Sequence, residues 1–162
     1  MVIFLPLLLN KEMGFGWDKI GVMFTIMLLP FLLFQWPAGF LADKKTGEKE
    51  ILTFGFLIMA AATFIIPLLS TPVFWIWAAV LFATRIGASL VEIASESYFF
   101  KHVREKDAGE ISVFRMVRSL SYVLAPLIAL PIVYFFSYSF SFYFLAFFVL
   151  IGLFFIPKKD TL

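Results

Sequence analysis

The 162-residue chain contains no cysteine and a single histidine, and only 15% of its residues are charged. The absence of cysteine excludes disulfide bonds and thiolate metal sites, and one histidine argues against a histidine-based metal centre. The sequence offers no nucleophile–histidine pair and no phosphate-binding loop. Its net charge of +2 is too small to favour nucleic-acid binding. We therefore expect no enzymatic activity, no cofactor and no nucleic-acid partner.

Apolar side chains make up most of the chain. They account for 62% of the residues, and the mean hydropathy is +0.99. Such a composition is typical of proteins that cross a membrane several times, whereas a soluble core of this size needs far less apolar surface. We therefore expect the lipid bilayer to be the main environment of the chain.

Five predominantly apolar runs are each long enough, or nearly so, to cross the hydrocarbon core, which takes about 20 residues as a helix. They cover residues 20–42, 51–69, 73–100, 111–136 and 142–156, and the last is expected to begin within the turn before it. Residues 1–10 form about half of a span, which is either the end of a helix whose beginning is missing or an interfacial stub. The sequence thus predicts an all-α polytopic bundle over residues 1–162, with five complete transmembrane helices and a partial N-terminal one.

The basic residues between the spans predict the orientation. Lys11 and Lys19 lie on one side of the membrane, and eight basic residues lie on the other. The eight are Lys44, Lys45, Lys49, Lys101, Arg104, Lys106, Lys158 and Lys159. Because the side richer in lysine and arginine faces the cytoplasm, we expect a multi-pass protein of the cell membrane with a cytoplasmic C-terminus.

The charged turn between the first two complete spans reads GFLADKKTGEKE, over residues 39–50. It resembles the cytoplasmic loop signature of the major facilitator superfamily, in which glycine, leucine, alanine, aspartate and a basic residue precede a second glycine and further basic residues. The matching residues are Gly39, Asp43, Lys44, Gly47 and Lys49. In the family this signature joins helices two and three, and a weaker copy joins helices eight and nine. Here Gly47 comes one residue late and Glu48 replaces a basic residue, so the turn is more similar to the weaker copy.

The resemblance implies that the chain corresponds to helices seven to twelve of such a transporter, with the start of helix seven lost and an N-terminal half-bundle missing. It also implies secondary active transport of a small solute by alternating access. Two alternatives stay open: a half-transporter that homodimerises, and a membrane scaffold that transports nothing. The resemblance implies that Asp43 contacts a helix of the other half-bundle and acts as a latch. Gly39, which has no side chain, would let a neighbouring helix approach closely. The alternative is that the turn is simply solvated.

Polar side chains inside the third and fourth complete spans are candidates for function. Arg85, Ser89, Glu92 and Glu96 recur every three or four residues and share one helix face, as do Arg115, Arg118, Ser119 and Tyr122 on the next span. Because the two spans meet at one loop, the glutamates and arginines lie at matching depths. We expect at least one ion pair between them, since an unpaired charge in a membrane is costly.

Four residues are candidates for coupling or for lining a cavity. Arg85-Ile86-Gly87 resembles an arginine–glycine pattern of proton-coupled family members, so Arg85 is either a coupling residue or a structural partner of Glu92 or of backbone. Gln35 and Tyr122 are candidates for lining a substrate cavity. Trp36, beside Gln35, is either a further cavity residue or an aromatic anchor at the membrane interface.

Overall fold

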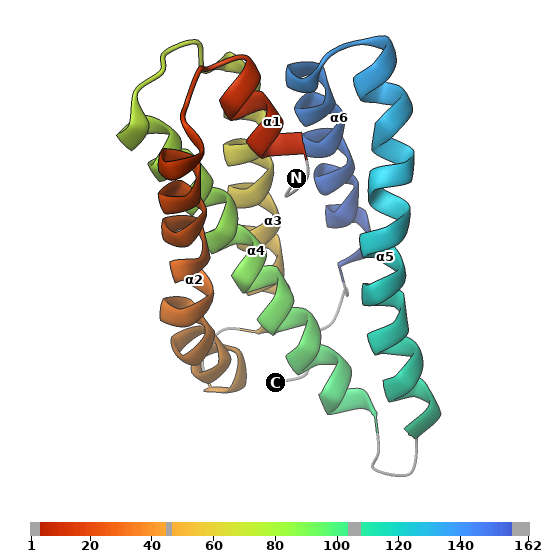
Figure 1. Cartoon of the computed structure of the whole chain (residues 1–162). Helices are drawn as coiled ribbons and strands as arrows, with labels where there is room; N and C mark the ends of the chain where they lie inside the picture. Colours follow the sequence, from red (N-terminus) through yellow and green to blue (C-terminus); the bar gives the residue numbers. More distant parts are fainter. Residues whose placement is uncertain (1–3, 45–46, 104–107, 157–162) are drawn as a thin grey trace.

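The computed structural model describes residues 4–44, 47–103 and 108–156, and within these ranges the chain is helical and contains no strand (Figure 1). The helices are α1 (Phe4–Lys11), α2 (Trp17–Lys44), α3 (Glu48–Ile65), α4 (Phe74–His102), α5 (Ala108–Phe135) and α6 (Tyr138–Ile151). Two short 3-10 helices, η1 (Ile66–Leu68) and η2 (Gly152–Phe155), extend α3 and α6. Five helices are long and apolar enough to span a membrane. The predicted all-α polytopic bundle is confirmed.

The helices extend beyond the apolar runs that predicted them. α2 continues to Lys44 and α3 begins at Glu48, so both ends of the charged turn are helical. α6 begins four residues before its predicted apolar run, because the side chain of Ser137 caps it by accepting a hydrogen bond from the backbone N–H of Phe140, at 3.1 Å. Apolar length thus marks the part of a helix in lipid, whereas caps and charged turns decide where the helix ends.

Successive long helices run in opposite directions. In Figure 1, α2 and α4 end at the lower end of the bundle, where α3 and α5 begin. Lys49, in the first turn of α3, and Lys101, in the last turn of α4, therefore lie at the same end. This is the alternation that the predicted topology requires.

The short helix α1 packs into the upper end of the bundle between α2 and α6 (Figure 1). Leu5, Leu8 and Leu9 are at most 1% exposed and join a core with residues from α2, α4 and α6. Trp77 of α4 lies in this core and donates a hydrogen bond from Nε1 to the carbonyl of Thr71, at 3.0 Å. Residues of the predicted partial N-terminal span are thus an integral part of the packed core.

α3 and α4 cross at two glycines. A Cβ atom added at Gly87 would lie 2.6 Å from the carbonyl oxygen of Gly55 and 2.6 Å from the backbone nitrogen of Met59. Real Cβ contacts essentially never come that close. The backbones of α3 and α4 can therefore approach each other this closely only because both positions are glycine. This crossing fixes how α4 is rotated about its own axis.

α5 stands apart from the other helices. None of the residues in its membrane-spanning window, 109–135, is buried. It contacts α6 at the upper end, and near the lower end Phe114 stacks on Phe99 of α4 with ring centroids 4.1 Å apart (Figure 1). Among the described residues, α5 is consequently left uncovered along most of its length.

Candidate functional site

The candidate site lies along the face of α4 that points away from α3. Arg85, Ser89, Glu92 and Glu96 fall within an arc of about 60°, whereas Gly87, which contacts α3, is about 200° from Arg85. The glycine crossing therefore turns this polar face outward from the α3 contact. We call Arg85, Glu92, Glu96 and the α5 residues Arg118 and Tyr122 the polar seam.

The guanidinium of Arg118 joins the two glutamates of the seam. Its Nη2 contacts Oε1 of Glu92, and its Nη1 lies 3.1 Å from Oε1 of Glu96. The side chains are 46% exposed for Arg118, 30% for Glu92 and 42% for Glu96, so the cluster lies at the surface of this bundle. The predicted ion pairing between these two spans is confirmed.

Helix geometry explains why Arg118 is the partner. Arg118 lies ten residues after the start of α5 and Glu92 ten residues before the end of α4, which places both about 15 Å from the same end. Arg115 lies one turn nearer that end; it is exposed and forms no ion pair with the described residues. Two carboxylates thus share one guanidinium, and the cluster keeps a formal charge of −1.

Arg85 has no such partner. Its Nε is enclosed and lacks a hydrogen bond, and its guanidinium forms no ion pair with the described residues. The structure thus shows no ion pair between Arg85 and Glu92, and the coupling role of Arg85 stays a prediction. Glu92 lies two turns away, about 10 Å along the helix, and its carboxylate is already held by Arg118. Tyr122 of α5, whose side chain is 74% exposed, is close enough to Arg85 for an electrostatic interaction.

Ser89 does not offer its hydroxyl to the seam. The residue is fully buried, and Oγ donates a hydrogen bond to the carbonyl of Ile86 at 2.9 Å. Thr84 does the same with the carbonyl of Leu81, at 2.7 Å. Both hydroxyls thus donate their hydrogen bonds to backbone carbonyls of α4 itself, as serine and threonine do in membrane helices.

The signature residues lie at the lower end of the bundle. The backbones of Gly39, Asp43 and Lys44 belong to the last turns of α2, while their side chains, like those of Gln35 and Trp36, fall outside the described part. Gly47 is the residue before the first turn of α3, and Lys49 lies exposed within that turn. The latch at Asp43 and the cavity role of Gln35 stay predictions.

Glu48 is a residue whose importance the sequence did not reveal. Its side chain is 0% exposed, its Oε1 lies 2.5 Å from Nζ of Lys101, and Ser97 donates a hydrogen bond to it at 3.3 Å. The first turn of α3 is thereby tied to the last turns of α4. The signal that was available is the charge reversal itself, because Glu48 stands where the family signature has a basic residue.

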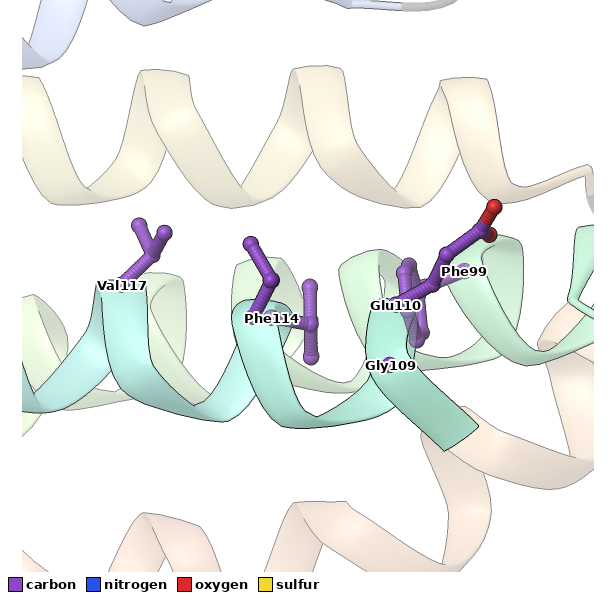
Figure 2. Close-up of a pocket in the computed structure, with 6 residues that line it drawn as sticks. Phe99, Gly109, Glu110, Phe114 and Val117 are labelled. Carbon is purple, nitrogen blue, oxygen red and sulfur yellow. The ribbon is translucent and has the colours of Figure 1, made fainter. Parts of the chain in front are cut away.

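A pocket of about 620 Å³ lies beside the seam, between the end of α4 and the first turns of α5. Figure 2 shows Glu110, Phe114 and Val117 following one another along α5, with Phe99 of α4 next to them. The remaining lining residues are Gly109 and Val113, so the walls are almost wholly apolar. The pocket suits an apolar group and includes none of the predicted site residues.

Comparison with known families places the chain. Residues 1–161 match the Major Facilitator Superfamily. Neither the curated proteins nor the solved structures contain a match. Within the described ranges, no group of three histidine, cysteine, aspartate or glutamate residues is placed to hold a metal ion. Because the family match covers essentially the whole length and the spans and loop signature agree with it, the chain belongs to the major facilitator superfamily of membrane transporters for small solutes.

Proposed function

We propose that this chain forms one half-bundle of a secondary active transporter that moves a small solute by alternating access. The observation that carries the proposal is the polar seam, in which ionisable side chains that are 30% to 46% exposed lie within two membrane-spanning helices. Ionisable groups inside a membrane are costly when they face lipid. A water-filled passage between two half-bundles gives this seam the environment it requires.

A transport assay tests the proposal. The protein is reconstituted into liposomes and offered radiolabelled sugars, carboxylates and drug-like cations, with empty liposomes as the control. We expect uptake of at least one class that saturates with concentration, because binding sites are limited in number, and that is inhibited by excess unlabelled solute. Uptake equal to that of empty liposomes for every class would favour the alternative of a membrane scaffold.

The second half-bundle has two candidate sources. The resemblance implies an N-terminal half encoded upstream in the same reading frame, carrying six further spans and a stronger copy of the loop signature. The alternative is a second copy of this chain. The molar mass of the transport-active protein in detergent, measured by light scattering and corrected for bound detergent, distinguishes them. A dimer of 18.5-kDa chains that transports would reject the first source.

Coupling to a proton gradient is a second candidate feature, and one observation favours it. Glu92 and Glu96 share the guanidinium of Arg118, so one carboxylate of the pair is in surplus. Surplus carboxylates inside spans are typical of proton pathways. We expect uptake to increase with an inward proton gradient and Glu92→Gln or Glu96→Gln to remove that increase. Uptake that is insensitive to the gradient in the unmodified protein would reject coupling.

We further propose that the lower end of the bundle in Figure 1 faces the cytoplasm. Since the chain has no cysteine, single substitutions can be labelled without background. A membrane-impermeant maleimide should label Ser70→Cys on intact cells and Lys49→Cys only after permeabilisation. Labelling of Lys49→Cys on intact cells would reverse the orientation.

The loop signature is proposed to act as a latch at that cytoplasmic end. Asp43 lies in the last turn of α2, and we propose that its carboxylate accepts from the free amides of a facing helix in the other half-bundle. We expect Asp43→Asn to lower uptake while membrane insertion stays normal. Uptake equal to that of the unmodified protein would leave the turn as a solvated loop.

A further inference from the structure

Arg85 is a cation with no ion-pair partner among the described residues. Nε of Arg85 is enclosed without a hydrogen-bond partner. The two acidic residues on its own helix face, Glu92 and Glu96, are both held by Arg118. The neighbouring ionisable group on α5 is Tyr122, a neutral hydrogen-bond donor rather than a counter-ion.

Arg85 also lies too deep to reach water at the ends of its helix. It is eleven residues after Phe74 and seventeen before His102, or roughly 16 and 26 Å along the axis. Arginines near helix ends extend to the interface, but one in the middle of a hydrocarbon core about 30 Å thick does not. Figure 1 shows α4 crossing the bundle obliquely and coming close to α5 only toward the lower end.

An arginine retained at this depth needs an anion. Its planar guanidinium presents a fork of donors that matches the two oxygens of a carboxylate or phosphate group. Tyr122 of α5 carries a hydroxyl on a side chain that is 74% exposed, and a tyrosine hydroxyl can donate to an anion. The same site offers an organic cation no unshared carboxylate within reach of this guanidinium.

We propose that Arg85 binds the anionic group of the transported solute, so that the substrate is a small organic anion bearing a carboxylate or phosphate group. The inference rests on the proposed transport function and adds the substrate class to it. Arg85 supplies the charge complement at mid-depth, and Tyr122 donates to the same group. The Arg118 cluster lies nearer the cytoplasmic end and does not take part in this contact.

Binding to the purified full chain tests the proposal without requiring transport. The thermal unfolding midpoint is measured in nanodiscs with benzoate, succinate and phenyl phosphate, and with benzamide and succinamide as neutral probes of similar shape. We expect at least one anion to raise the midpoint in a concentration-dependent manner and its neutral counterpart to have no effect. No shift with any anion, or equal shifts with the neutral probes, would overturn the proposal.

Variants then locate the contact. Arg85→Gln should weaken anion affinity by about 30-fold or more, because it removes a desolvated charge pair. Arg85→Lys should bind the anion with an affinity between those of the unmodified protein and Arg85→Gln, since lysine keeps the charge but lacks the forked donors of the guanidinium. Lys19→Gln, which removes an exposed charge at the start of α2, should bind as the unmodified protein does. Unchanged affinity in Arg85→Gln would overturn the proposal, and if that variant misfolds, the comparison of anions with neutral probes on the unmodified chain decides.

Two further results separate the possible failures. Absence of anion binding together with a lower midpoint in Arg85→Gln would point to a partner group within the protein, and would overturn the solute contact. Uptake of neutral or cationic solutes that Arg85→Gln leaves unchanged would reject the anion inference but keep the transport function. Anion binding without uptake of any solute class would reject the transport function and keep the binding site.

Discussion

The contribution of a charged side chain to stability depends on its immediate partners, as in the cluster of Glu92, Glu96 and Arg118. The three side chains are 30% to 46% exposed in the isolated bundle, yet each lies in a segment that crosses the membrane. In water such a pair contributes little, about 1 kcal/mol or less. Beside a lipid or a narrow passage, removing one partner leaves the other charge without neutralisation, and the cost increases.

Arg118→Ala is predicted to destabilise the protein by about 1–2 kcal/mol, because it strands two carboxylates in the span. Combining it with Glu92→Gln should recover part of the loss, since fewer unpaired charges remain. The thermal unfolding midpoint of the single and double variants in detergent measures this coupling. Arg115→Ala is the matched control, as Arg115 is exposed and has no ion pair among the described residues. Strictly additive effects would show that the pair contributes nothing to stability.

Glu48 behaves differently, because it is fully enclosed at the start of α3. A carboxylate there is favoured by the positive end of the helix dipole and by Lys101. Glu48→Gln is predicted to lower stability by about 2 kcal/mol, less than for a wholly buried pair because Lys101 is 29% exposed and can turn toward water. The control is Glu50→Gln, an exposed residue of the same turn. Equal midpoints for the two variants in a thermal unfolding experiment would contradict the prediction.

At the scale of helices, the number, order and spans were predictable because the length of an apolar run reflects the thickness of the bilayer. The polar faces of α4 and α5 were predictable from helical periodicity alone. The choice of Arg118 over Arg115 was not, because it depends on depth and rotation to within one turn. The lack of an ion-pair partner for Arg85 was not predictable either, because Glu92 pairs with Arg118 instead. The burial of Glu48 depends on a contact with Ser97, 49 residues away, that local pattern does not contain.

The rotation of α4 is set where Gly55 and Gly87 meet, so a side chain there should disturb the whole seam. Gly87→Ala is predicted to destabilise the protein by about 1–3 kcal/mol, because its Cβ would contact backbone atoms that cannot move aside. Gly21→Ala in α2 is the matched control, since nothing lies within 4 Å of the added atom. Thermal unfolding in detergent compares the two. A midpoint for Gly87→Ala at or above that of the control would show that the helices separate at little cost.

At the scale of the whole molecule, packing is concentrated at the upper end of the bundle, where α1, α2, α4 and α6 share one core. α5 contributes no buried residue in its spanning window. A helix this long with polar groups at its centre is typical of the wall of a passage that another bundle completes. We therefore propose that water and solute reach the middle of the seam from each side of the membrane in turn.

Tyr122 is the position at which to measure this, because it lies near the middle of α5 and next to Arg85. Tyr122→Cys is labelled with a membrane-impermeant thiol reagent in right-side-out and in inside-out vesicles, with Phe147→Cys on the exposed surface of α6 as a control facing lipid. We expect Tyr122→Cys to react from both sides, with transported solute shifting the ratio of the two rates, and Phe147→Cys to react from neither. Reaction of Tyr122→Cys from one side only, or from neither, would contradict alternating access through this seam.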